Sequence, residues 1–135
     1  MSEKPINILI VEDEQIVAVD IKSVLQRLGY RVVGTAARGE EACRMAAESS
    51  PDLILMDVRI DGPMDGIEAA RRIQETADVP VVFLTAYTDN ETLDRAKDIE
   101  PYGYLVKPFA ERDLQATVEV ALHKGAVDRR LRESH

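Results

Sequence analysis

Short runs of apolar, mostly β-branched residues alternate along the chain with longer segments in which apolar residues recur at helical spacing. The short runs are typical of buried strands, and the longer segments are typical of amphipathic helices. We expect strands over residues 6–11, 31–36, 53–56, 79–84 and 102–106. We expect helices over residues 16–28, 40–47, 66–75 and 89–97, and a last helix from residue 110. Thr88 or Asp89 is expected to be the N-cap of the helix over 89–97.

This alternation with short connections predicts an α/β fold, in which a five-stranded parallel sheet is covered by helices on both faces. Right-handed crossovers make a doubly wound arrangement the simplest topology. In such folds ligands bind at the carboxyl ends of the strands, near the point where the strand order reverses. Polar residues that follow the predicted strands are therefore the first candidates for a functional site.

Side chains that can carry chemistry follow four of the five predicted strands. They are Glu12, Asp13 and Glu14 after the first strand, Asp57 after the third, Thr85 after the fourth and Lys107 after the fifth. Carboxylates gathered at one edge repel each other unless a cation joins them, and a small set of oxygen ligands suits Mg²⁺. A carboxylate in such a site can attack phosphorus, while a lysine and a hydroxyl stabilise the phosphoryl oxygens.

Four segments carry these residues: ILIVEDE, LILMD, VVFLTA and YLVKPF. In this order, and along nearly the whole chain to about Leu122, they resemble the receiver domains of response regulators in two-component systems. The resemblance implies a flavodoxin-like (βα)5 fold with strand order 2-1-3-4-5. It implies a receiver domain over residues 1–123, followed by residues 124–135 as a basic tail or the start of a helical linker.

The resemblance also implies a role for each residue at the phosphorylation site. Asp57 corresponds to the phospho-acceptor, and Glu12 and Asp13 correspond to the acidic pair that binds Mg²⁺ with it. The backbone carbonyl of Arg59 corresponds to a further metal ligand, and Lys107 to the lysine that assists phosphoryl transfer.

A second group of residues is implied to control switching and the lifetime of the phosphoryl group. Thr85 corresponds to the switch hydroxyl and Tyr104 to the switch aromatic. The side chains of Arg59 and Tyr87 correspond to positions that govern access of water to the phosphate; because both are large, we expect slow dephosphorylation. Pro108 corresponds to a proline that usually follows a cis peptide bond.

For a receiver, the implied phosphoryl donor is a sensor histidine kinase or a phosphotransfer protein. The implied output surface combines the helix over 89–97, the strand over 102–106 and the helix from 110, and a homodimer through this surface is one expectation. Such a phosphoprotein serves phosphorelay signal transduction as a regulator. It is not an enzyme in the usual sense, because it catalyses only its own phosphorylation and dephosphorylation.

Composition narrows the partners and the location. The formal net charge of −8 repels nucleic acid and anionic membranes at long range, so we expect neither as a direct partner. Cys43 is the only cysteine, which excludes a disulfide framework and a cysteine-based metal site. No apolar run approaches the ~20 residues needed to cross a bilayer, and the N-terminus lacks the apolar core of a secretory signal. We therefore expect a cytoplasmic location.

Three other functions compete with the receiver. A phosphohydrolase of the haloacid-dehalogenase type needs an Asp two residues after its nucleophile, where this chain has Arg59. A flavodoxin-like cofactor binder needs a phosphate-cradling loop after the first strand, where this chain has an acidic run. A module of receiver fold that is never phosphorylated stays open.

Two further expectations concern the path of the loop after Asp57 and the end of the last helix. After Asp57 the loop over 58–66 is slightly longer than the common family pattern and contains Asp61-Gly62, although Gly62 and Pro63 keep turn chemistry. We expect the last helix to end its packed part near Leu122, because the apolar stripe weakens there and Gly125 interrupts it. The charged residues beyond are interpreted either as a frayed tail or as a truncated signalling helix.

Overall fold

A five-stranded parallel sheet forms the centre of the computed structural model, which describes residues 4–86, 89–95 and 99–133. The strands are β1 (Asn7–Val11), β2 (Arg31–Ala36), β3 (Leu53–Asp57), β4 (Val81–Thr85) and β5 (Gly103–Val106). The helices in these residues are α1 (Gln15–Arg27), α2 (Gly39–Ser49), α3 (Gly66–Thr76), α4 (Asn90–Asp94) and α5 (Glu111–Glu133). The strand order is β2-β1-β3-β4-β5, which confirms the expected doubly wound α/β fold.

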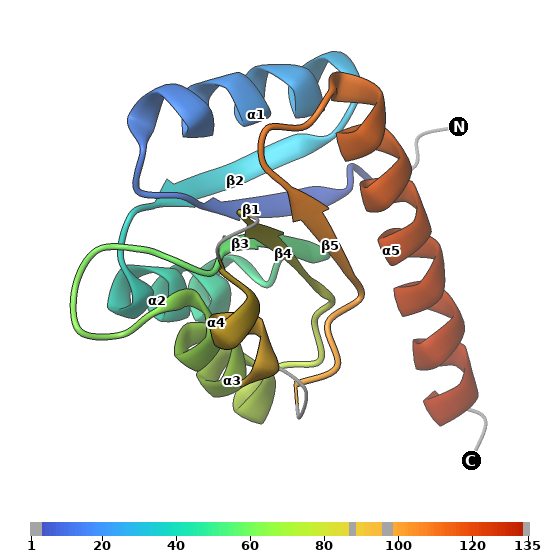
Figure 1. The fold of residues 1–135 in the computed structure, drawn as a ribbon. Coiled ribbons are helices and arrows are strands. Elements are labelled where there is room, and N and C mark those ends of the chain that lie inside the picture. Colours follow the sequence, from blue (N-terminus) through green and yellow to red (C-terminus); the bar gives the residue numbers. More distant parts are fainter. Residues whose placement is uncertain (1–3, 87–88, 96–98, 134–135) are drawn as a thin grey trace.

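Helices cover both faces of the sheet, with α1 and α5 on one face and α2 and α3 on the other (Figure 1). Alternate residues of each central strand point to opposite faces. In β1, Ile8 and Ile10 pack with α1 and α5, while Leu9 and Val11 pack with α2 and α3. Both sets are fully buried, which explains why the central strands are apolar at every position rather than at every second one.

Observed boundaries differ from the sequence-based ones by a few residues. β4 begins at Val81 instead of residue 79, after Pro80, which has no N–H to contribute to a sheet ladder. The carbonyl of Pro80 still accepts a hydrogen bond from the amide of Ile54, at 3.0 Å. α4 covers Asn90–Asp94 of the expected helix over 89–97, whose end lies outside the described residues.

A tight contact joins the end of β3 to the start of α3. Asp65 is the N-cap of α3 and accepts a hydrogen bond from the amide of Glu68 at 2.9 Å. The next residue, Gly66, donates its amide to the carbonyl of Val58 at 3.0 Å. A Cβ atom on Gly66 would lie 1.9 Å from the carbonyl oxygen of Asp57. The absence of a side chain at Gly66 thus lets α3 begin directly against the backbone of Asp57.

The loop over 58–66 follows a path that the sequence alone does not define. Asp61 forms an isolated parallel bridge with Arg38, just before α2. Gly62 has a φ of 95°, a conformation that favours glycine. The guanidinium of Arg38 lies against Gly62, where a Cβ atom would be 2.8 Å from its Nη2. The additional residues of this loop therefore lie against the start of α2.

The expectation that packing ends near Leu122 is wrong. α5 continues without interruption through Gly125 to Glu133 and runs along the right side of Figure 1. Gly125 is buried, and a Cβ atom there would lie 2.7 Å from Cγ of Pro80. The hydroxyl of Tyr102 is 2.5 Å from Oδ2 of Asp128, and the Lys124 ammonium lies 5.6 Å from the Tyr102 ring centroid. The glycine permits close approach and does not break the helix.

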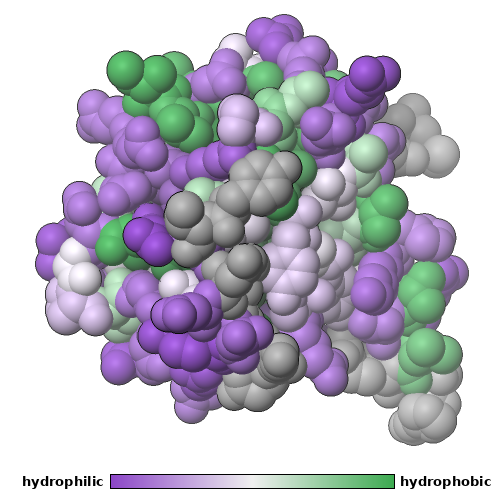
Figure 2. Space-filling model, in the orientation of Figure 1, coloured by the Kyte–Doolittle hydropathy of each residue, from purple (hydrophilic) through white to green (hydrophobic). Residues whose placement is uncertain are grey.

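The surface is mostly hydrophilic, with hydrophobic groups over the start of α1 and along α5 (Figure 2). Exposed large apolar residues on these two helices are Ile16 and Val19 on α1 and Val120 and Leu131 on α5. Among the helices in the described part of the chain, none is long and apolar enough to cross a bilayer.

Candidate functional site

Three carboxylates meet at the carboxyl ends of β1 and β3. Glu12 and Asp13 directly follow β1, and Asp57 is the last residue of β3, its neighbour in the sheet. One carboxylate oxygen from each lies within 4.8 Å of the others. Glu12 is 3% exposed and Asp57 is 5% exposed, so two of the three charges are largely withdrawn from water. The parallel register of β1 and β3 thus assembles the acidic cluster that the sequence predicts.

Lys107 supplies a positive charge to this cluster from the end of β5. Its ammonium donates to Oε1 of Glu12 at 2.5 Å and to Oδ2 of Asp57 at 2.6 Å. Its backbone amide donates to the carbonyl of Thr85 at 2.7 Å, and the Lys107–Pro108 peptide bond is cis. Burial alone would lower the pKa of Lys107, but the hydrogen bonds to Asp57 and Glu12 outweigh it and raise this pKa above its ordinary value.

The pKa of the Glu12 carboxyl group is strongly shifted in this arrangement. Burial raises its pKa from 4.5 to about 7; the hydrogen bond from Lys107 opposes the rise, and the charge of Asp57 adds to it. Metal-free protein therefore holds a proton on Glu12 at a pH where an unfolded chain would have lost it.

We predict that Glu12 makes metal-free protein less stable as the pH rises from about 4.5 to about 7. Between these values the folded state binds more protons than the unfolded state, so the free energy of unfolding falls with increasing pH. Glu12→Gln should remove this part of the dependence. Urea unfolding at pH 5 and pH 8 in the presence of a chelator would measure it. Parallel pH profiles for wild type and Glu12→Gln would contradict the prediction.

Both oxygens of the Asp57 carboxylate have donors in the protein. The amide of Arg59 donates to Oδ1 at 3.0 Å, and Lys107 donates to Oδ2. Such donors hold the carboxylate in one orientation and can also stabilise charge that develops on a group bound there. The cluster sets three carboxyl groups against one ammonium, which contacts Glu12 and Asp57, and every side-chain donor that the cluster offers to a cation is an oxygen. This donor set fits a hard divalent cation such as Mg²⁺.

Thr85 lies at the end of β4, buried, with its hydroxyl directed to the start of α4. Its Oγ1 is 3.2 Å from the carbonyl oxygen of Ala86 and 3.3 Å from Oδ2 of Asp89. Oδ2 of Asp89 also accepts from the amide of Ala86 at 2.8 Å. The guanidinium of Arg59 forms an ion pair with Oδ1 of Asp89. Asp89 therefore contacts two of the residues singled out in the sequence.

From the sequence, Asp89 is interpreted only as an alternative to Thr88 for the cap of the helix over 89–97. Its side chain is 3% exposed, which is unusual for a carboxylate. The sequence signal for the contacts of Asp89 with Thr85 and Arg59 was an acidic residue four positions after the predicted switch hydroxyl and a basic residue two positions after Asp57. Thr88 and Tyr87 lie outside the described residues, so the role expected for Tyr87 stays a prediction.

Tyr104, in β5, is 46% exposed. Its ring is stacked on Phe83 of β4, with centroids 6.2 Å apart and planes at 28°. Tyr104 and Thr85 thus lie on neighbouring strands, and their joint role in switching stays a prediction.

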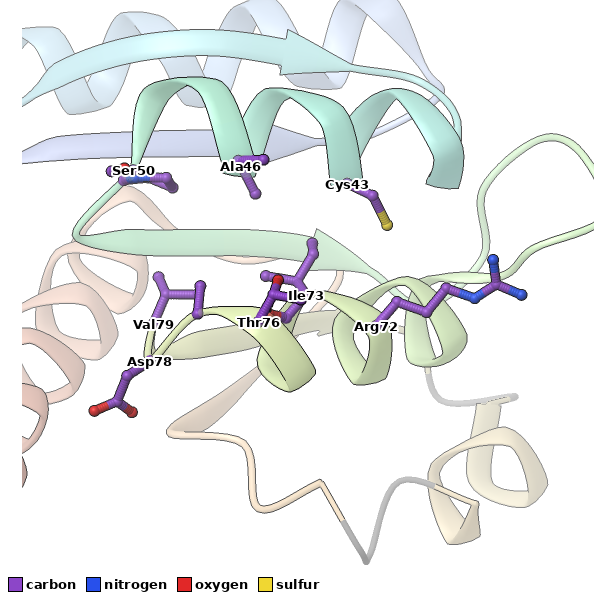
Figure 3. Close-up of a pocket in the computed structure, with 11 residues that line it drawn as sticks. Cys43, Ala46, Ser50, Arg72, Ile73, Thr76, Asp78 and Val79 are labelled. Carbon is purple, nitrogen blue, oxygen red and sulfur yellow. The ribbon is translucent and has the colours of Figure 1, made fainter.

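A groove between α2 and α3 lies away from this cluster (Figure 3). Its lining includes Pro51 and Val79, which precede β3 and β4, whereas the carboxylates of the cluster lie at the carboxyl ends of β1 and β3. Cys43 also lines it, with Sγ 3.9 Å from the carbonyl oxygen of Ala69. Burial raises the pKa of Cys43, which makes the thiol a poor nucleophile at neutral pH.

Comparison with known proteins agrees with this geometry. Residues 8–119 match the response regulator receiver domain family. The transcriptional regulatory protein PdtaR of Mycobacterium tuberculosis is 39% identical over 120 residues, which make up 89% of this chain and 58% of PdtaR. The phyllosphere-induced regulator PhyR of Methylorubrum extorquens is 36% identical over 129 residues, or 95% of this chain and 47% of PhyR. The chain thus spans about half the length of these relatives.

One solved structure matches this chain along nearly the full length of both proteins. The signal receiver domain of a modulated diguanylate cyclase from Desulfovibrio desulfuricans superposes with a TM-score of 0.87 at 39% sequence identity. The match covers 93% of this chain and 99% of that domain. The similarity therefore concerns this domain as a whole, including all the strands whose ends carry the cluster.

Proposed function

Because this chain belongs to the response regulator receiver family of two-component systems, we propose that it accepts a phosphoryl group on Asp57. The donor is a phosphohistidine on a sensor histidine kinase or a phosphotransfer protein. The observation that carries the proposal is the placement of Asp57 at the end of β3 between two donors, the Lys107 ammonium and the Arg59 amide.

In the transfer, a carboxylate oxygen of Asp57 attacks phosphorus and a new P–O bond forms as the P–N bond of the phosphohistidine breaks. The phosphohistidine reacts with its other ring nitrogen protonated, so the electron pair of the broken bond stays on the leaving nitrogen and the product is neutral histidine. Lys107 and the Arg59 amide stabilise negative charge on the phosphoryl oxygens, so positioning and charge supply most of the catalysis. Thr85 adds a hydroxyl donor once it turns from Asp89.

Glu12, Asp13 and Asp57 would hold Mg²⁺, together with the backbone carbonyl of Arg59 that the family resemblance indicates. The ion would supply neutralisation of the negative charge that accumulates when a phosphoryl group meets three carboxylates. Glu12 and Asp57 are buried on either side of the Lys107 ammonium, while Asp13 is partly exposed. Asp13 is therefore the carboxylate most readily substituted without disturbing that ammonium.

We predict that Asp13→Ala weakens Mg²⁺ binding and phosphorylation together. Because clustered carboxylates repel each other in the metal-free protein, the same substitution should leave metal-free stability unchanged or raise it. Metal affinity by calorimetry, the phosphorylation rate and urea unfolding would be measured on one preparation. Asp20→Ala, which removes an exposed carboxylate from α1, is the matched control. Unaltered Mg²⁺ affinity in Asp13→Ala would exclude Asp13 as a ligand.

The proposed function is tested by incubating the protein with acetyl phosphate and Mg²⁺, then reducing the acyl phosphate with borohydride. Reduction converts a phosphorylated aspartate to homoserine, and peptide mass spectrometry locates it. We expect homoserine at position 57 alone, and none when a chelator replaces Mg²⁺. Labelling at another carboxylate would overturn the assignment of Asp57, and no labelling at all would favour an unphosphorylated interaction module of the same fold.

Phosphorylation is proposed to switch the surface formed by α4, β5 and α5. The phosphoryl group would draw Thr85 toward Asp57, and the ring of Tyr104 would fill the space that Thr85 leaves. A homodimer through this surface and a cytoplasmic location stay predictions from the sequence. The output of the whole protein is likewise a proposal, since the relatives named above extend well beyond the matched region.

A further inference from the structure

Asp89 is a buried carboxylate that the proposed phosphotransfer does not use. It lies at the start of α4, and its side chain is 3% exposed. A buried carboxylate is strongly disfavoured unless charge and hydrogen bonds compensate for lost water. Asp89 obtains this compensation from three groups: the amide of Ala86, the hydroxyl of Thr85 and the guanidinium of Arg59.

Two of these three groups also belong to the phosphorylation site. Arg59 donates its backbone amide to Asp57 while its side chain pairs with Asp89. Thr85 has a single hydroxyl proton, and its acceptors in this structure are the carbonyl of Ala86 and the carboxylate of Asp89. Between these acceptors the carboxylate makes the stronger hydrogen bond because it is charged. The hydroxyl proton is thus directed to Asp89.

We propose that Asp89 is a positioning residue that holds the Thr85 hydroxyl and the Arg59 guanidinium away from the phosphoryl site until Asp57 is phosphorylated. The proposal rests on the proposed function, because it concerns the response to a phosphoryl group on Asp57. A phosphoryl group competes directly with Asp89, since it too offers anionic oxygens to a hydroxyl and a guanidinium.

The competition couples the site to α4. When Thr85 and Arg59 turn to the phosphoryl group, Asp89 keeps the amide of Ala86 but loses its other two partners. A buried carboxylate without its cation is unstable where it lies, so the start of α4 should move to bring Asp89 into water. Asp89 therefore opposes the switched arrangement before phosphorylation and displaces α4 after it.

Removing the carboxylate should shift the population toward the switched arrangement without any phosphoryl group. The Arg59 side chain is 66% exposed, which reduces the strength of its ion pair. We therefore expect a modest effect. Asp89→Ala should increase the rate of phosphorylation by acetyl phosphate about fivefold, the factor that corresponds to roughly 1 kcal/mol.

The first measurement needs neither metal nor phosphoryl donor. Scalar couplings of the Thr85 side chain, measured by NMR on metal-free protein, report whether its χ1 angle occupies one rotamer. We expect one rotamer in wild type, averaging over rotamers in Asp89→Ala, and an intermediate result in Asp89→Asn, which keeps an oxygen acceptor but loses the charge. Glu91→Gln, which neutralises an exposed carboxylate on the same helix, should match wild type.

The second measurement is the acetyl phosphate rate on the same variants. An unchanged single Thr85 rotamer in Asp89→Ala would overturn the proposal, as would a fixed rotamer in wild type that differs from the one directed to Asp89. A released rotamer with an unchanged or slower rate would overturn the claim that the contact opposes phosphorylation. If wild type itself takes no label, the proposed function fails, while the rotamer comparison still decides the role of Asp89.

Discussion

Asp57→Asn is expected to reduce phosphoryl incorporation from acetyl phosphate to background. The amide has no anionic oxygen to attack phosphorus, and the acyl phosphate of an aspartate cannot form from it. The fold should persist, because the amide oxygen of the substituted side chain can still accept from the Arg59 amide or from Lys107. The expected effect is therefore complete loss of labelling in a folded protein.

Asp61→Asn is a suitable control, because Asp61 is an exposed carboxylate in the loop that follows Asp57. It should label like wild type. The pKa of Glu12 in metal-free protein is a second readout of Asp57→Asn. Because the charge of Asp57 helps to raise this pKa, the substitution should lower it. Incorporation into Asp57→Asn at the wild-type level would show that the acceptor is a different residue.

Gly66→Ala is expected to be among the most destabilising single substitutions in this chain. The new Cβ atom would lie 1.9 Å from the Asp57 carbonyl oxygen and 3.0 Å from the Cα of Val58, and both are backbone atoms. Neither can turn away as a flexible side chain would, so the end of β3 or the start of α3 must shift. We expect a loss of about 3 kcal/mol or more in the free energy of unfolding.

Urea unfolding measures this loss as a lower midpoint, provided that the slope with denaturant is unchanged. Gly103→Ala is the matched control, because a Cβ on Gly103 in β5 would meet its nearest atom, Cγ2 of Thr117, at 3.4 Å. That substitution should change stability by less than about 1 kcal/mol. Because the clash of Gly66→Ala involves the backbone of Asp57 itself, phosphorylation should fall along with stability. Equal midpoints for the two alanine variants would refute the argument.

The sequence predicted the sheet well because burial determines it on both faces. β1 and β3 are apolar at nearly every position, and a parallel sheet between two helical layers is the arrangement that buries such strands completely. The acidic cluster followed from this, since parallel strands place Glu12, Asp13 and Asp57 at one edge. The strand order came from the family resemblance, because the apolar pattern does not distinguish one parallel order from another.

Contacts that depend on the path of irregular segments were not predictable in the same way. The burial of Asp89 depends on the path of the chain between β4 and α4, and the sequence of that segment has no hydrophobic periodicity from which its path could be predicted. Gly125 was interpreted as an interruption of the apolar stripe on the last helix, but the backbone at Gly125 packs closely against Pro80. A glycine within a helix indicates either a break or a close contact, and only the position of the neighbouring element decides between them.

Because α5 is unbroken, the direction of its axis relative to the sheet determines the orientation of any domain joined to its end. Its later turns are attached to the strand layer through Gly125 on Pro80 and through Asp128 on Tyr102, so the helix axis has a defined orientation relative to the sheet. Each helical residue advances the chain by about 1.5 Å and rotates it by about 100°. A reporter domain joined through a continuous helix would therefore change its rotational phase with every residue inserted at the junction. An insertion of about seven residues completes nearly two full turns and so nearly restores that phase. An insertion of about two residues rotates the reporter by roughly half a turn, to the opposite side of the helix axis.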